Sequence, residues 1–276
     1  MTPVKQASFV TDAINFSKSF GKKSLTNYFL GADKTAALIQ EAKVYSVTTE
    51  ETIFLFKNNG DFYNLYFFAS CLESLEQGLA EIKRTYGTQE FVVDIVSTQF
   101  STPIIDVFTE SGFVTYTSLV RMSRTDAIAI NEEALADANQ TVASASDAEQ
   151  VFHLLNQYFD PRAEQLPDLA EVNAWINQGR VLVYKVNKEL AGFIIFELNG
   201  LTLYLRYWFV SPNHRDKKIG SKLFNFFLDK GKASKRQLFW VIQTNENAIV
   251  RYRHYGFKEE RMYNFVLNNK NKKHEG

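Results

Sequence analysis

The sequence predicts an α/β protein built from two copies of one domain. Short runs in which apolar and aromatic residues alternate are typical of β-strands, and stretches with helical periodicity separate them. The same order of elements then occurs twice, and each copy closes with a Gly-Phe pair, at Gly112 and at Gly256, 144 residues apart. A repeat of this length indicates two complete domains rather than a solenoid.

The elements of the two halves follow in the same order, and a hairpin in the first half corresponds to a three-stranded meander in the second. In the first half we expect strands at 52–57 and 62–69, a helix at 72–85, a strand at 91–96, a helix that ends at Gly112, and a last strand. In the second half we expect strands at 181–185, 191–198 and 201–210, a helix at 219–230, a strand at 238–243, a helix that ends at Gly256, and a last strand. Asn-Gly pairs mark the hairpin turns, and glycine before phenylalanine ends a helix by taking the left-handed conformation.

A change of composition separates the two copies. The stretch between Met122 and Ala143 is rich in alanine and acidic residues and poor in aromatic ones, which indicates a connector. We predict a first domain at 1–123, a linker at 124–140, a second domain at 141–267 and a disordered tail at 268–276.

Charge and composition exclude several classes of function. The 31 basic and 31 acidic residues cancel, so net charge gives no support for a nucleic-acid or membrane partner. Cys71 is the single cysteine, which excludes an internal disulfide framework and fits a reducing cytosol. We see no signal peptide and no apolar run long enough for a bilayer, and we expect a cytoplasmic protein without a metal.

The most informative stretch joins a strand to a basic helix start. The strand ends before Pro212, because proline cannot donate to a sheet ladder, and apolar periodicity then predicts the helix at 219–230. The first-turn amides of a helix lack partners within the helix, and the helix dipole is positive there. Arg215, Lys217 and Lys218 flank this start, so the turn has the make-up of a phosphate-binding site.

Residues 141–267 resemble the GNAT superfamily of acyl-CoA-dependent N-acyltransferases on two motifs. Residues 210–220, VSPNHRDKKIG, are similar to the family pattern of Arg or Gln, two residues, Gly, one residue, then Gly or Ala. Residues 245–257, NENAIVRYRHYGF, match the family spacing of Asn, Ala, Tyr and Gly-Phe. The resemblance implies two tandem GNAT-like domains, each a mixed, mostly antiparallel sheet flanked by helices. The first copy is degenerate, because it has no basic turn, and we expect it to be a scaffold.

In that family the amides of the basic turn hold the pyrophosphate of coenzyme A, and the strand before it contacts the pantetheine arm. The positions that inherit cofactor binding are Phe209, Val210, Arg215, Asp216, Lys217, Lys218, Ile219, Gly220, Ser221 and Asn245. A bulge in the strand would free backbone groups for the arm and aim one N–H at the thioester carbonyl. Lys218 stands where the family usually has glycine, and would cost about 1 kcal/mol if the turn needs a positive φ.

The resemblance assigns the chemistry to Tyr252, as the acid that protonates or hydrogen-bonds the departing thiolate. The corresponding residue of the first half is Phe108, which can pack but cannot donate. Asn245 begins the helix, where it can cap the helix or contact the cofactor amides.

The general base stays open at this point. Many family members carry a carboxylate on the strand that enters the turn, whereas residues 201–210 contain none. The candidates for base or substrate contacts are Glu197 acting through water, Asp160 and Glu164 recognising a cationic amine, Tyr207 shaping the acceptor pocket, and the two histidines His153 and His214. An amine with a lowered pKa, or a water chain, would need no side-chain base.

The resemblance implies an enzyme that uses acetyl-CoA as cosubstrate and acylates a primary amine of a small molecule or peptide by direct attack. A homodimer is compatible with the sequence. One alternative is a regulatory protein that senses acyl-CoA without turnover, which the missing strand carboxylate and Lys218 favour. A Fem-type aminoacyl transferase is a weaker alternative, because those enzymes use charged tRNA and do not need the basic turn.

Overall fold

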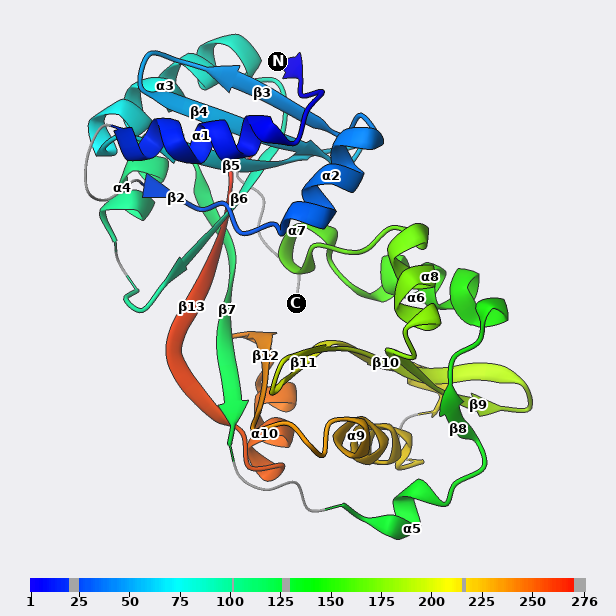
Figure 1. Ribbon diagram of the computed structural model, residues 1–276. Coiled ribbons are helices and arrows are strands. Elements are labelled where there is room, and N and C mark those ends of the chain that lie inside the picture. The colour runs from blue at the N-terminus through cyan, green and yellow to red at the C-terminus, as the bar shows by residue number, and fades with distance from the viewer. Residues whose placement is uncertain (20–24, 101, 126–129, 215–216, 271–276) are drawn as a thin grey trace. The chain divides into compact units, whose positions relative to one another are not determined.

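The computed structural model describes residues 1–19, 25–100, 102–125, 130–214 and 217–270 (Figure 1). Contacts divide the chain into two compact units. Unit 1 contains Met1–Leu119 and the described residues from Arg261 onward, and unit 2 contains Val120–Glu260. We describe each unit by itself.

Unit 1 is a sheet covered by helices on both faces. Its elements are β1 (Thr2–Pro3), α1 (Ser8–Ser19), β2 (Leu25–Thr26), α2 (Ala32–Gln40), β3 (Val44–Thr48), β4 (Thr52–Asn58), β5 (Tyr63–Ala69), α3 (Leu72–Tyr86), β6 (Phe91–Ser97), α4 (Pro103–Glu110), most of β7 (Val114–Arg124) and most of β13 (Lys258–Asn268). The strand order is β1-β3-β4-β5-β6-β13, and β5–β6 is a parallel pair among antiparallel ones.

The two faces of this sheet carry two separate cores. Helices α3 and α4 cover one face with Leu79 and Phe108, and α1 and α2 cover the other with Ala13 and Leu38. Strands β4 and β5 are therefore buried almost throughout, as strands covered on both faces must be.

Unit 2 repeats this plan. Its elements are α5 (Glu132–Leu135), β8 (Gln140–Val142), η1 (Ala145–Asp147), α6 (Ala148–Tyr158), α7 (Pro161–Glu164), α8 (Leu169–Asn177), β9 (Val181–Val186), β10 (Glu189–Asn199), β11 (Thr202–Val210), η2 (Pro212–His214), α9 (Ile219–Lys230), β12 (Arg236–Ile242) and α10 (Glu246–His254). The strand order is β7-β12-β11-β10-β9-β8, with β11–β12 parallel and β8–β9, β9–β10 and β10–β11 antiparallel. Helices α6 and α8 share a buried core with β9, β10 and β11.

The predicted fold is confirmed. Both units have a mixed, mostly antiparallel sheet flanked by helices, and every strand and helix expected from residue 52 to Gly112 and from 181 to Gly256 is present. The two glycines end their helices in the left-handed region, with φ of 95° at Gly112 and 83° at Gly256. At these positions a Cβ would strain the backbone, which explains why the repeat is visible in the sequence.

The compact units and the predicted domain bounds divide the chain differently at its end. Residues Tyr263–Asn268 of β13 pair with β6, and the N–H of Phe91 donates to the side chain of Asn269 at 2.8 Å. This strand and the first residues after it therefore belong to unit 1 by contact, although the repeat in the sequence assigns the strand to the second copy. The bounds 1–123, 124–140, 141–267 and 268–276 stay a prediction.

Within the described residues, no helix combines the length and the apolar character that crossing a bilayer requires.

Candidate functional site

Strand β11, which leads to the basic turn, separates from its parallel neighbour partway along its length. It pairs with β12 only from Thr202 to Tyr204, whereas it stays paired with β10 as far as Val210. In the described part of unit 2 no strand pairs with the other edge of β11 over residues 205–210. We call this stretch the open edge of β11, and the backbone groups that face it have no strand partner.

A β-bulge interrupts β11 at Arg206, as predicted for this strand. Ile195 of β10 lies opposite Tyr207, and Phe196 lies opposite Leu205, so Arg206 has no partner residue in the ladder. The guanidinium lies 3.8 Å from the Glu197 carboxylate. This ion pair gives Glu197, a predicted candidate for the base, a partner of opposite charge.

The backbone of Val210 faces the open edge, and that of Phe209 faces β10. The N–H of Ser211 donates to Ala191 of β10, and the carbonyl oxygen of Phe209 lies 2.8 Å from where a Cβ on Gly192 would be. Alternate residues of an antiparallel strand present their backbone groups to opposite edges. Of the two strand residues predicted to contact the cofactor, Val210 thus has its N–H and C=O available, while Phe209 packs its ring at 4.7 Å from that of Tyr158.

Helix α9 begins without a side-chain cap. Its N-cap is Lys218, with φ of 58°, and within the described residues no side chain caps the first turn. The N–H of Lys222 is the first to reach back into the helix, to Lys218 O at 3.1 Å, which leaves the amides of Ile219, Gly220 and Ser221 without helical partners. The first turn contains no acidic residue. With its positive φ, Lys218 has the left-handed conformation, whose expected cost for a residue with a side chain is about 1 kcal/mol.

Two basic-turn positions, Arg215 and Asp216, lie outside the described residues. Next to them, the ammonium of Lys217 lies 3.3 Å from Nδ1 of His214, and both side chains are exposed or partly exposed. His214 therefore contacts the turn rather than the interior of the domain.

The start of α9 lies against the open edge through Gly220 and Trp208. A Cβ at Gly220 would lie 3.2 Å from Cζ2 of Trp208, so the glycine allows the close approach of helix and strand. The indole Nε1 of Trp208 is enclosed and has no hydrogen-bond partner in the described part of the protein. An enclosed donor without an acceptor costs about 1–3 kcal/mol, so a bound acceptor at this place would be stabilised.

Tyr252 of α10 lies between the separating strands β11 and β12. Its ring centroid is 5.6 Å from that of Trp208 on β11 and 4.0 Å from that of Phe239 on β12. Burial raises the pKa of the Tyr252 hydroxyl above its usual value, so the phenol stays protonated at neutral pH. Among the described residues its hydroxyl has no hydrogen-bond partner.

Other predicted side chains have structural contacts of their own. Asn245 caps α10, since Ala248 N–H donates to its Oδ1 at 3.1 Å, and Asp160 caps α7 through Arg162 N–H at 2.8 Å. The buried Tyr207 donates its hydroxyl to the carbonyl of Glu164 at 3.2 Å. Among these side chains, Glu164 is the one whose pKa is raised into the neutral range, to about 7, chiefly by burial.

In unit 1 strand β5 also separates from its parallel neighbour β6, but other residues of the same unit bind the edge that this leaves. Strand β5 pairs with β6 only at Tyr63 and Asn64, and β2 then pairs with the end of β5. Between the two strands, the side chain of Asn27 donates to Leu65 O at 3.0 Å and Asp94 O at 3.2 Å. It also accepts the N–H of Phe67 at 2.9 Å.

The helix that follows in unit 1 also differs from α9. At the start of α3 the Ser74 hydroxyl accepts the N–H of Cys71 at 3.2 Å, and Glu73 places a negative charge in the first turn. Both features disfavour an anion. The unit that lacks the basic motif thus also lacks the open edge and the uncapped helix.

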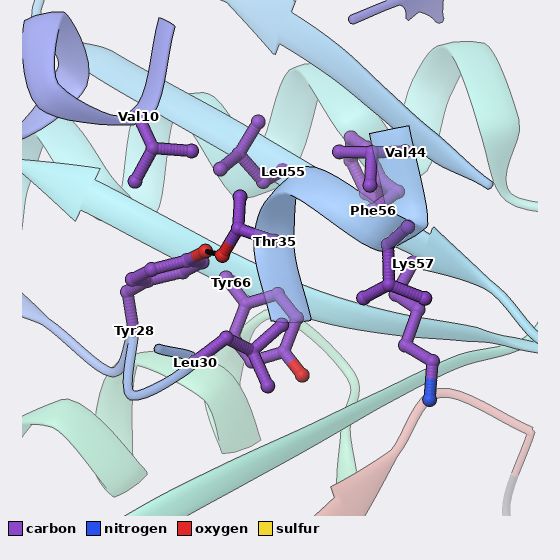
Figure 2. A pocket seen from close by; sticks show the side chains of 10 residues that line it. Val10, Tyr28, Leu30, Thr35, Val44, Leu55, Phe56, Lys57 and Tyr66 are labelled. Carbon is purple, nitrogen blue, oxygen red and sulfur yellow. Dashed lines mark hydrogen bonds between the residues drawn. The ribbon is translucent and has the colours of Figure 1, made fainter. Parts of the chain in front are cut away.

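Two pockets lie away from these residues. The pocket in Figure 2 belongs to unit 1, is lined mainly by apolar side chains from Val10 to Tyr66, and has a volume of about 10 Å³, which is room for about one water molecule. A pocket of about 310 Å³ in unit 2 is lined by Val120, Gln243, Glu246, Ile249, Val250, Arg253 and Glu259. None of the predicted site residues lines either pocket. Within the described ranges no group of His, Cys, Asp and Glu could hold a metal ion.

Comparison with known proteins agrees with this geometry. The model of the acetyltransferase (GNAT) family matches residues 148–257. No curated protein matches the sequence. A GCN5-related N-acetyltransferase from Sphaerobacter thermophilus is similar in structure, with a TM-score of 0.57, 11% identity, and coverage of 97% of this chain and 93% of that chain.

Two further solved structures are similar over nearly the whole chain. A tandem GNAT protein from the clavulanic acid biosynthesis pathway has a TM-score of 0.56 and 10% identity, and 97% of each chain is covered. A GNAT-family acetyltransferase from Colwellia psychrerythraea has a TM-score of 0.55 and 11% identity, with 97% of this chain and 98% of that chain covered. At these identities the likeness concerns the fold, and the family model does not extend into the first half. Residues 148–257 therefore match the model of the acetyltransferase (GNAT) family, in a chain whose fold is similar to that of a tandem GNAT protein.

Proposed function

We propose that unit 2 transfers an acetyl group from acetyl-CoA to a primary amine, by direct attack of the amine on the thioester. The observation that carries this proposal is the uncapped start of α9 beside the open edge of β11. Three unpaired amides on a positive helix end suit the linked phosphates of coenzyme A, and an unpaired strand edge suits the amides of its pantetheine arm. The single cysteine and the absence of net charge support a cytoplasmic protein that acts on a small molecule or peptide.

The residues present fit this cosubstrate. Lys217 and Lys218 add positive charge next to the amides of α9, and Val210 offers a backbone N–H on the open edge. The enclosed Nε1 of Trp208 is a further donor that needs an acceptor. We assign Tyr252 to the departing sulfur. A phenol has a pKa of about 10 and a thiol one of about 8.5, so hydrogen-bonding to the developing thiolate is favoured over complete proton transfer.

The proposal is tested by binding and by thiol release. Coenzyme A should raise the melting temperature, because a ligand of the folded state stabilises it. Titration calorimetry should give one site per chain, since unit 1 fills the corresponding edge with Asn27. Acetyl-CoA offered with a panel of primary amines should release free thiol. Without any thermal shift, both the site and the activity would be rejected.

Replacing Tyr252 by Phe should slow thiol release severalfold or more and leave coenzyme A affinity nearly unchanged. The ring keeps its contacts with Trp208 and Phe239, so the fold is retained, while the hydroxyl that would bond the sulfur is lost. The rate of thiol release at saturating acetyl-CoA measures the effect. Tyr255→Phe, at the C-cap of the same helix, is the matched control, and equal rates for the two variants would contradict the assignment.

A non-catalytic acyl-CoA sensor is the second candidate. The ion pair between Glu197 and Arg206 favours it, because this contact gives a predicted candidate for the base a partner of opposite charge. A sensor would show the thermal shift and the single binding site without releasing thiol for any amine.

A further inference from the structure

The short helix α7 is fixed to β11 next to the bulge. Asp160 caps the helix, and Gln165 ends it with φ of 48°. The hydroxyl of Tyr207, the residue that follows the bulge, donates to the carbonyls of Glu164 and Gln165 at 3.2 Å each. These contacts hold the last turn of α7 at a defined place beside the strand.

The carboxylate of Glu164 lies in this turn with little to neutralise it. It accepts the N–H of Asp160 at 3.2 Å, and in the described part of the chain it has no basic partner. Its charge acts on the hydroxyls of both Tyr207 and Tyr252, which lie on β11 and α10. The carboxylate is thus within electrostatic reach of the residue assigned to the sulfur.

The surroundings of Glu164 shift the pKa of its carboxyl towards neutral pH. Burial raises the pKa of the carboxyl, the hydrogen bond from the Asp160 backbone lowers it and the negative charge of Asp160 raises it, and together these bring it to about 7. The charged groups that act on the two tyrosines are Arg206 and Glu171 at Tyr207 and Arg251 at Tyr252. A carboxylate with this pKa can take up and release a proton near neutral pH.

We propose that Glu164 is the proton acceptor for the attacking amine, an inference that rests on the proposed function. The amine nitrogen attacks the thioester carbonyl carbon, so that a C–N bond forms and the C–S bond breaks with its electron pair going to sulfur. A proton leaves the nitrogen for the Glu164 carboxylate, and the thiolate, to which Tyr252 donates a hydrogen bond, takes a proton from water. Solvent then removes the proton from Glu164, and the products are an amide and a thiol.

The two other carboxylates near the strand are less suited to this role. Glu197 is paired with Arg206 at 3.8 Å. Asp160 uses an oxygen to cap α7 at 2.8 Å. Glu164 combines burial, the absence of a cation partner among the described residues, hydrogen bonds that tie its turn to β11, and an electrostatic effect on Tyr252.

The first experiment compares Glu164→Gln with Glu197→Gln and the wild-type protein. Thiol release from acetyl-CoA is measured between pH 5 and 9 with amines of different pKa. A change of rate caused by ionisation of the amine shifts with the pKa of the amine, whereas one caused by the enzyme does not. The wild-type rate should fall below about pH 7 for every amine. The Glu164→Gln variant should lose this pH dependence and react roughly 100-fold more slowly. Its melting-temperature shift by coenzyme A should be unchanged. The Glu197→Gln variant should keep the pH dependence.

The second experiment needs no turnover. A carboxyl whose pKa is raised on folding holds its proton more tightly in the folded state, so this group lowers stability progressively as pH rises from the unfolded value towards 7. Glu164→Gln should therefore gain melting temperature relative to the wild type between pH 5 and pH 8. A difference that stays constant with pH would overturn the inference.

The outcomes separate the two proposals. Turnover by the wild type with an unchanged pH profile in Glu164→Gln would overturn the role of Glu164 and leave the proposed function standing. Binding of coenzyme A with no thiol release for any amine would overturn both.

Discussion

Replacing Ser221 by Glu should weaken coenzyme A binding at least about 100-fold while slightly raising the stability of the free protein. Ser221 is an exposed residue in the uncapped first turn of α9. A carboxylate at this position accepts hydrogen bonds from free backbone amides and interacts favourably with the positive end of the helix dipole. This interaction contributes about 0.3–1 kcal/mol to stability. The same charge repels a bound phosphate by about 4 kcal/mol at 4 Å and an effective dielectric constant of about 20. The two effects have opposite signs, so unfolding cannot imitate the result.

Calorimetric titration and thermal melting of the same preparation measure both effects. Ser221→Gln is the matched control, because it has nearly the same size and no charge, and it should lose much less affinity. High salt should reduce the difference between the two variants. If Ser221→Glu bound coenzyme A as tightly as the control does, the phosphates would have to lie elsewhere.

The sequence predicts those features that depend on local chemistry. Gly112 and Gly256 are visible because a left-handed helix end penalises every residue with a Cβ. The turn before α9 is visible because Pro212 and the apolar period of the helix fix where the strand ends and the helix begins. The cost expected for Lys218 also follows from local geometry, and its φ of 58° shows that the condition is met.

Features that arise from tertiary contacts were not predictable in this way. Neither the four-residue helix α7 nor the pKa of Glu164 follows from sequence spacing, because the pKa depends on what buries the carboxyl. Likewise, nothing in the pattern before residue 52 indicates that Asn27 binds two strands. The pairing of β13 with β6 is also non-local, and a repeat in the sequence carries no information about which sheet its last strand joins.

Replacing Asn27 by Ala should destabilise the protein by about 3 kcal/mol. The side chain makes three hydrogen bonds to backbone groups of β5 and β6, at 3.0, 3.2 and 2.9 Å. Each bond contributes about 1 kcal/mol, and the freed N–H and carbonyl groups lie between strands where alanine offers no replacement. The melting temperature should fall by roughly 5–10 °C. Asn156→Ala removes a single exposed bond within a helix and should change it little.

The same variant separates two explanations for the silent first unit. If the Asn27 side chain alone excluded coenzyme A, its removal would create a second binding site. We expect calorimetry to give one site still, because Glu73 lies in the first turn of α3 and Ser74 bonds the N–H of Cys71 there. A negatively charged and capped first turn does not attract phosphate even beside an unpaired strand edge. Two sites in Asn27→Ala would show that the strand edge, rather than the helix start, decides where the nucleotide binds.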